Sequence, residues 1–232
     1  MNKIGIIVAM KSEFEALYNN IGTKIETINN GIREIYHYKR NNLDIYVTDT
    51  AEGEIAASSM TQYLITKFDV EMILNFGLCG SLNNNYKCKD LVVVKELIHY
   101  QFDISELDNS MVVGQYPGYN SNIFQTDLKL IDLLDSIQYL PKVKVASGDK
   151  FVGSEESKNN LINKFNCDIC EMESAGIIIT SHANNIPCLL IKCISDNASD
   201  DAHIEFREII NDGINQYVEL IIKFLDKIAL FY

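Results

Sequence analysis

The chain has 232 residues, of which 47% are hydrophobic and 22% charged, and its formal net charge is −12. This length is enough for one sizeable core, so we expect a single α/β domain over residues 1–232. The negative charge repels phosphate backbones and anionic lipids, which disfavours nucleic acid and membrane surfaces as partners. We therefore expect a small-molecule ligand. The sequence has no run of ~18 apolar residues and no signal-peptide pattern, which predicts a cytoplasmic protein.

Strand and helix signals alternate along most of the chain. Short apolar or alternating runs predict strands, and apolar residues at every third or fourth position predict helices. In chain order these are a strand at residues 4–9, a helix at 12–22, a strand at 43–50, a helix at 55–68, a strand at 72–76, a strand at 143–147, a helix at 155–165, an extended segment at 167–172, a helix at 174–184 and a strand at 188–194. This alternation predicts an α/β fold with a central mixed, mainly parallel β-sheet covered by helices.

Four local features refine this pattern. Ser12 and Glu15 form a capping box that opens the first helix, and residues 77–81 predict a glycine-rich turn. Residues 97–125 are polar and rich in Asn, Gly and Tyr, which predicts a long irregular segment of the kind that is functional or mobile. Apolar residues at helical spacing predict one long final helix docked on the core, and they are Ile210, Ile214, Val218, Ile221, Leu225 and Ile228.

The six cysteines mostly lie inside apolar runs, where a free thiol packs as a small hydrophobic group. Cys167 and Cys170 match a Cys-x-x-Cys redox motif, but acidic neighbours such as Asp168 and Glu171 do not lower a thiol pKa. The sequence offers no second close cysteine pair for a zinc site. We therefore expect core packing rather than redox or metal chemistry.

Two carboxylates follow strand-like runs in the C-terminal half. Glu173 comes directly after the extended segment at 167–172, and Asp196 follows the strand at 188–194. Ligands of α/β sheets bind beyond the carboxyl ends of the strands, so we expect these two side chains to face one another across one pocket.

Five blocks of sequence resemble those of a known enzyme family, in the same order. The most specific parts are Ser-Gly-Asp-x-Phe, Glu-Met-Glu and Ile-Ser-Asp, and one of them alone would be a weak signal. The blocks are residues 4–13, 75–80, 146–152, 171–175, and 194–196 with 203–206. In them the chain resembles the bacterial 5′-methylthioadenosine/S-adenosylhomocysteine nucleosidases, within the nucleoside phosphorylase and uridine phosphorylase superfamily.

The resemblance implies that water cleaves the N-ribosidic bond of 5′-methylthioadenosine or S-adenosylhomocysteine and releases adenine, with no metal or organic cofactor. Asp196 matches the general acid that protonates the purine at N7, and burial with nearby carboxylates should raise its pKa. Glu13 matches the residue that positions the attacking water, and Glu173 the one that holds the ribose hydroxyls. Ionised carboxylates suit both tasks because they only accept hydrogen bonds and favour positive charge on the sugar.

The resemblance also assigns the purine and ribose contacts. Phe151 matches the aromatic residue that stacks on adenine, and Val152 matches one whose backbone hydrogen-bonds the base edge. Met172 matches an apolar wall under the ribose. Glu171 and Gly80 belong to the matching blocks and are expected at the same substrate-binding site.

The expected pocket for the 5′ substituent is lined by Phe206 and, from the irregular segment, by Leu107 and Pro117. In the family a partner subunit supplies part of this lining. The resemblance therefore implies a homodimer.

Each residue also has a simpler interpretation. Glu13 in a first helical turn favours the helix dipole, and Asp196 stands in a sequence typical of turns and helix caps. Phe151 and Met172 are residue types that usually fill cores. The joint occurrence of Glu13, Glu173 and Asp196 in family order favours the site interpretation.

Departures from the family pattern bear on substrate preference and efficiency. Leu78 stands where the family usually has a serine near the ribose, and Lys192 stands where it has arginine. Residues 50–54 read Thr-Ala-Glu-Gly-Glu instead of Ser-Gly-Ile-Gly-Lys. The reaction class remains the same in this interpretation.

Three other functions remain open from the sequence. A purine nucleoside phosphorylase needs a cationic phosphate cradle, whereas Glu13, Glu52 and Glu54 are expected to face the ribose here. A futalosine-type hydrolase would share the acid and the ribose anchor but accept a larger 5′ group. A nucleoside-binding sensor would not need both a proton donor and a water acceptor.

Overall fold

The sheet is built from strands distributed over the whole chain. The computed structural model describes residues 2–15, 17–212 and 217–231. Its strands are β1 (Lys3–Val8), β2 (Thr23–Asn30), β3 (Arg33–Arg40), β4 (Leu43–Asp49), β5 (Met72–Ser81), β6 (Leu91–His99), β7 (Phe124–Gln125), β8 (Lys142–Ser147), β9 (Ile169–Glu171) and β10 (Cys188–Asp196). Its helices are α1 (Lys11–Glu15), α2 (Glu54–Phe68), α3 (Leu128–Asp135), α4 (Glu155–Phe165), α5 (Ser174–Ala183), α6 (Ala202–Asp212) and α7 (Val218–Phe231).

The sheet is mixed, and one part of it closes on itself. The strand order is β10-β6-β8-β9-β5-β1-β4-β3-β2, and β10 also pairs with β5, so β5, β9, β8, β6 and β10 form a ring. The central pairs of β1 with β4 and β5, and of β5 with β10, are parallel. The expected α/β fold with a mixed sheet is confirmed. The ring brings the carboxyl ends of β5, β8, β9 and β10 together.

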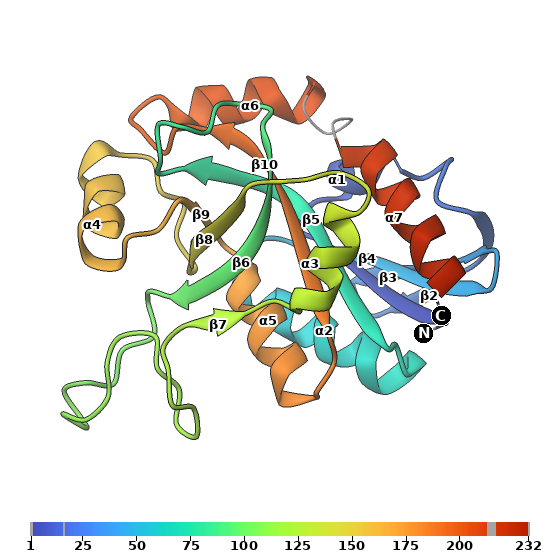
Figure 1. The fold of residues 1–232 in the computed structure, drawn as a ribbon, viewed down its shortest axis with the longest axis horizontal. Coiled ribbons are helices and arrows are strands. Elements are labelled where there is room, and N and C mark those ends of the chain that lie inside the picture. The colour runs from blue at the N-terminus through green and yellow to red at the C-terminus, as the bar shows by residue number, and fades with distance from the viewer. Residues whose placement is uncertain (1, 16, 213–216, 232) are drawn as a thin grey trace.

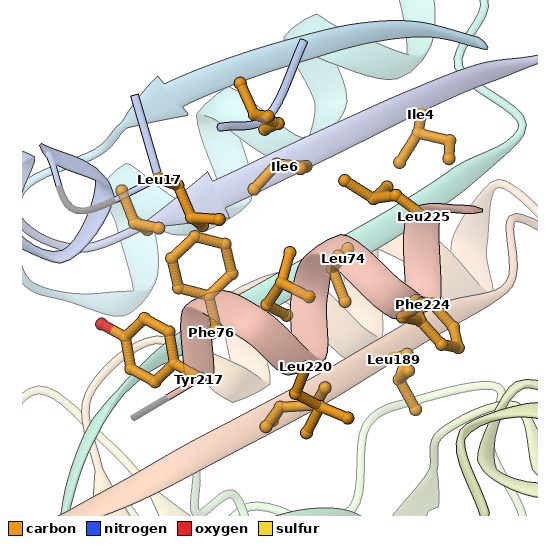
Figure 2. Close-up of a cluster of buried hydrophobic side chains, with 14 of the residues drawn as sticks. Ile4, Ile6, Leu17, Leu74, Phe76, Leu189, Tyr217, Leu220, Phe224 and Leu225 are labelled. Carbon is orange, nitrogen blue, oxygen red and sulfur yellow. The ribbon is translucent and has the colours of Figure 1, made fainter. Parts of the chain in front are cut away.

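Helices cover both faces of the sheet (Figure 1). Side chains alternate along a strand, so Ile4 and Ile6 of β1 pack in one core cluster with α3 and α7, and Ile7 packs in the other with α2 and α5. Figure 2 shows Leu220, Phe224 and Leu225 of α7 beside side chains of β1, β5 and β10. Burying each such side chain contributes about 1.5–3 kcal/mol. None of the helices in the described ranges is long and apolar enough to cross a bilayer.

Three sequence predictions differ from the structure. Residues 77–81 were expected to form a turn, but they continue β5. The glycines in this stretch leave room for side chains that pack against the strand, Glu13 at Gly77 and Asp196 at Gly80. The single final helix is two helices, α6 with Ile210 and α7 with the stripe from Val218 onward, and Ile214 lies outside the described residues. The first helix begins at Lys11 and ends at Glu15, so Ser12 lies inside it rather than at its cap.

Several elements of the structure are absent from the sequence prediction. Strands β2, β3 and β6 and helix α3 were not predicted. Most of β2 is exposed, so it lacks the alternation of buried and exposed residues that identifies a strand.

Candidate active site

A cavity of about 260 Å³ opens at the carboxyl ends of β1, β5, β9 and β10. Nine of the residues expected at the substrate site lie on its wall, and they are Glu13, Gly80, Phe151, Val152, Glu171, Met172, Glu173, Asp196 and Phe206. Glu173 and Asp196 therefore share one pocket, as the strand pattern predicted.

Glu13 reaches the cavity from α1 and is 1% exposed. Its Oε2 accepts hydrogen bonds from the backbone N–H groups of Ala9 and Met10, both at 2.9 Å, and its Oε1 accepts one from Leu78 at 3.0 Å. Gly77 makes this approach possible, because a Cβ there would lie 2.9 Å from Oε1. Burial raises the pKa of Glu13, although these backbone hydrogen bonds oppose the change.

Asp196 ends β10 and is 2% exposed. Its Oδ1 accepts a hydrogen bond from the Ala198 N–H at 2.8 Å, and its Oδ2 lies 2.6 Å from the Ser195 hydroxyl. A Cβ at Gly80 would lie 2.9 Å from Oδ1, so glycine leaves room for this carboxyl group. Burial raises the pKa of Asp196 and Glu205 adds to the effect, which is the direction predicted for a general acid.

Glu173 stands at the N-cap of α5 but does not cap the helix with its own side chain. The backbone N–H groups of residues 173–176 are instead satisfied by Glu171 of β9, Ser147 of β8 and Glu54 of α2. The Glu173 carboxylate therefore stays available to the cavity. The closing of the sheet makes this possible, because it brings β8 and β9 to the start of α5.

A buried ion pair lies beneath Glu173. Lys192 Nζ is 2.9 Å from Glu171 Oε2, and their side chains are 1% and 3% exposed. Burial opposes ionisation of Glu171, but the Lys192 ammonium group lowers its pKa below the ordinary value. Burial and the Glu171 carboxylate raise the pKa of Glu173 to about 8, while its Oε1 accepts a hydrogen bond from the Gly53 N–H at 3.0 Å.

Glu52 in the loop before α2 and Glu54, the first residue of α2, lie in two different places. Glu52 lines the cavity, as expected. Glu54 does not: it is 6% exposed and hydrogen-bonds Ser147 Oγ and the Gly176 N–H. The expectation that Glu54 faces the ribose was wrong, because the first residue of α2 turns its side chain toward α5.

An aromatic pair lies on one wall of the cavity. Phe151 is 44% exposed, so it is not a core residue, and its ring meets that of Phe206 at 5.9 Å and 76°. Val152 is buried beside it. The flat face of an exposed aromatic ring is suited to stacking on a planar ligand.

Leu107 and Pro117 do not line the cavity in this chain. Leu107 is 87% exposed, and Pro117 is also exposed. Both belong to the β6–β7 segment (residues 100–123), which projects from the body of the molecule (Figure 1). The expectation that they form part of this pocket fails for a single copy, because their segment runs away from it.

The cysteines are free, and five of the six are buried. Cys167 and Cys170 are not bonded to one another, and burial raises the pKa of Cys167 to about 12. The expectation of core packing is confirmed. Sequence reasoning did not find Met10, Lys150 and Ser195, which also line the cavity. Each is next to or within a matching block, and that position was the available signal.

Residues 3–229 match the model of the phosphorylase superfamily. The chain belongs to this superfamily. An aminodeoxyfutalosine nucleosidase of Helicobacter pylori strain J99 is 30% identical, over 98% of this chain and all of that protein. A 5′-methylthioadenosine/S-adenosylhomocysteine nucleosidase of Buchnera aphidicola is 31% identical, over 95% of this chain and 97% of that protein.

The solved structures agree with this assignment. The methylthioadenosine/S-adenosylhomocysteine nucleosidase of H. pylori, with butyl-thio-DADMe-Immucillin-A, has a TM-score of 0.92 and 28% identity over 98% of this chain and 99% of that one. The resemblance drawn from the motifs is confirmed. These relatives are nucleosidases, so the chain is an enzyme of the N-glycosyl hydrolase type.

Proposed function

We propose that this enzyme hydrolyses the N-ribosidic bond of 5′-methylthioadenosine and S-adenosylhomocysteine. The observation that carries the proposal is the joint presence of Glu13, Glu173 and Asp196, all buried, on the wall of one cavity. Similar proteins that carry this activity in their names span nearly the whole chain.

Asp196 is the general acid in this proposal. Loss of the purine is assisted when N7 gains a proton, and a carboxyl group can donate it at neutral pH only if its pKa is raised. Burial has that effect on the pKa of Asp196. Phe151 stacks on the purine, and the Val152 backbone hydrogen-bonds its edge.

Glu13 positions the water, and Glu173 holds the ribose hydroxyls. Three backbone N–H groups fix the Glu13 carboxylate, so a water bound to it has a defined direction of attack. Met172 forms the apolar wall under the sugar. Negative charge at Glu13 and Glu171 favours the cationic sugar of the transition state.

Water is the nucleophile rather than phosphate. Among the described residues that line the cavity, the one cation is Lys150, an exposed residue whose Nζ is 3.4 Å from Ser157 Oγ. Glu13 and Glu52 would repel a dianion. This charge pattern disfavours the phosphorylase alternative.

A specific observation supports a second candidate substrate. The aminodeoxyfutalosine nucleosidases are similar to this chain over all of their length, at 28–30% identity. Their named substrate shares the purine and ribose with methylthioadenosine, so the acid and the anchor would serve equally well. We propose that the 5′ end of the pocket is completed in a homodimer, with Leu107 and Pro117 of a second copy near Phe206.

The test is adenine release by the purified chain from methylthioadenosine, S-adenosylhomocysteine, aminodeoxyfutalosine and inosine. We expect turnover of the first two and none of inosine. Preference for aminodeoxyfutalosine by more than about tenfold in kcat/KM, which is 1.4 kcal/mol, would favour the second candidate. Tight nucleoside binding without turnover would favour a sensor.

A further inference from the structure

The turn that follows Asp196 has an unusual backbone conformation. Ala198 is buried and has a φ of 49°, in the left-handed region that residues other than glycine rarely adopt. In this conformation its N–H donates to Asp196 Oδ1 at 2.8 Å. Gly80 lies against both residues, because a Cβ there would be 2.9 Å from Asp196 Oδ1 and 3.3 Å from the Ala198 Cβ. Such a conformation persists only where the surrounding structure holds it.

Two charged side chains hold the residue between them, Asn197. Lys158 reaches it from α4, and its Nζ donates to the Asn197 carbonyl at 2.7 Å. Glu205 reaches it from α6, where its Oε2 accepts from the Asn197 backbone N–H at 2.8 Å and its Oε1 accepts from Asn197 Nδ2 at 3.1 Å. Both polar groups of the Asn197 backbone are therefore fixed by side chains that lie far from it in the sequence.

Lys158 is the less expected member of this pair. Lysine is rarely buried, but Lys158 is only 9% exposed. Its contact with Asn197 is charge-assisted, which makes it stronger than a hydrogen bond between neutral groups. Burying an ammonium group is costly, and an apolar residue would attach α4 to the body of the molecule without that cost. The contact with Asn197 therefore calls for an explanation beyond the docking of α4.

We propose that Lys158 and Glu205 are positioning residues for Asp196, an inference that rests on the proposed role of Asp196 as the general acid. Through Asn197 they fix the turn at Ala198, and the Ala198 N–H in turn holds the carboxyl group. A general acid must lie within hydrogen-bond reach of the atom that it protonates. Loss of the contact from Lys158 should therefore reduce turnover more than nucleoside binding.

The two residues also act on the proton of Asp196 in opposite directions. Burial raises the pKa of Asp196, and hydrogen bonds from Ser195 and Ala198 oppose that change. Of the charged groups, Glu205 raises this pKa further and Lys158 lowers it. Among the described residues, the other titratable groups that face Asp196 are thiols that burial keeps neutral by raising their pKa, and they are Cys79, Cys88 and Cys170.

The test follows kcat/KM for methylthioadenosine against pH in Lys158→Met and Glu205→Gln. A general acid loses activity as pH rises through its pKa, so this decline reports Asp196. Lys158→Met removes a positive charge and should move the decline to higher pH, whereas Glu205→Gln removes a negative charge and should move it to lower pH. Lys158→Met should also lower kcat by about 10- to 100-fold, a typical cost of misplacing a catalytic group, while KM stays within about threefold.

Lys164→Met and Glu208→Gln are the matched controls, since each removes the same charge from an exposed position on the same helix. Neither should change kcat by more than about twofold or move the decline. Test variants that match their controls, or that both shift in one direction, would overturn the proposal. A lower melting temperature of Lys158→Met with unchanged kcat would reduce Lys158 to docking α4 and overturn it as well.

Glu205→Gln keeps the test decisive if Lys158→Met does not fold, because glutamine still offers an oxygen to the Asn197 N–H. A decline that does not move to lower pH in this variant would overturn the proposal. Failure of the proposed function gives a different result. A wild type that does not hydrolyse methylthioadenosine, or an Asp196→Asn variant with more than about a third of wild-type activity, would refute the role of Asp196 itself.

Discussion

Two regions differ in how firmly the chain holds their side chains. One is the floor of the cavity, by which we mean Glu13, Glu173 and Asp196, and the other is the β6–β7 segment. On the floor, Glu13, Glu173 and Asp196 are at most 6% exposed, and each accepts backbone hydrogen bonds from the same chain. In the β6–β7 segment, Leu107 is 87% exposed. The chain itself buries and supports the first region and leaves Leu107 of the second exposed.

This difference separates the chemistry from the choice of 5′ group. Groups that transfer a proton or aim a water must be held within a fraction of an ångström, which buried hydrogen bonds achieve. A surface that contacts a variable substituent needs no such support, and loops tolerate change more readily. Substitutions on the floor should therefore change rates, and substitutions in the segment should change rankings among substrates.

The largest effect is expected for Asp196→Asn. The amide is nearly isosteric but cannot donate a carboxyl proton, so kcat should fall by ~10² to 10⁴-fold while the fold is retained. Steady-state kinetics and the melting temperature measure the two effects. Activity above about a third of wild type would remove Asp196 from the role of general acid.

Glu13→Gln should lose hydrolysis but keep nucleoside binding, because the water acceptor is altered while the purine and ribose contacts remain. Isothermal titration with a non-hydrolysable analogue separates binding from turnover. Glu15→Gln is the matched control, since Glu15 is exposed on the same short helix. Equal loss of binding and catalysis would mean that Glu13 shapes the pocket instead.

Phe151→Ala and Leu107→Ala compare the wall of the cavity with the β6–β7 segment. Phe151→Ala should weaken the binding of every adenine nucleoside alike, by about 1–3 kcal/mol, because stacking does not depend on the 5′ group. Leu107→Ala should leave methylthioadenosine turnover within about twofold and alter only the ranking of bulkier 5′ substituents. Unchanged binding with a lower melting temperature in Phe151→Ala would contradict the stacking role.

The residues of the cavity floor could mostly be predicted from the sequence. The buried contacts that hold them in place could not. The blocks that contain Glu13, Glu173 and Asp196 lie at strand ends, and strand ends are readable from apolar runs. The contacts of Glu54, Ser147 and Lys192 depend on how β8, β9 and β10 close around α5, which no local pattern encodes. The glycines of residues 77–81 were taken as a turn signal. Glycine is typical both of turns and of strand positions where another side chain packs closely against the backbone, and here it serves the second purpose.

A separate effect is expected on stability as a function of pH. The pKa of Glu173 rises from 4.5 to about 8 on folding, so the folded state binds more protons between these values and loses stability as pH rises. The melting temperature of wild type should fall between pH 5 and about pH 8, and Glu173→Gln should flatten part of that fall. A parallel decline in both proteins would contradict the raised pKa.

The central claim is that water, rather than phosphate, attacks the sugar. The dialysed enzyme is incubated with methylthioadenosine in phosphate-free buffer, phosphate is then titrated, and the sugar product is identified by mass. We predict full adenine release without phosphate and a free 5-methylthioribose at every phosphate concentration. A strict phosphate requirement, or a sugar 1-phosphate as the main product, would contradict the hydrolase assignment.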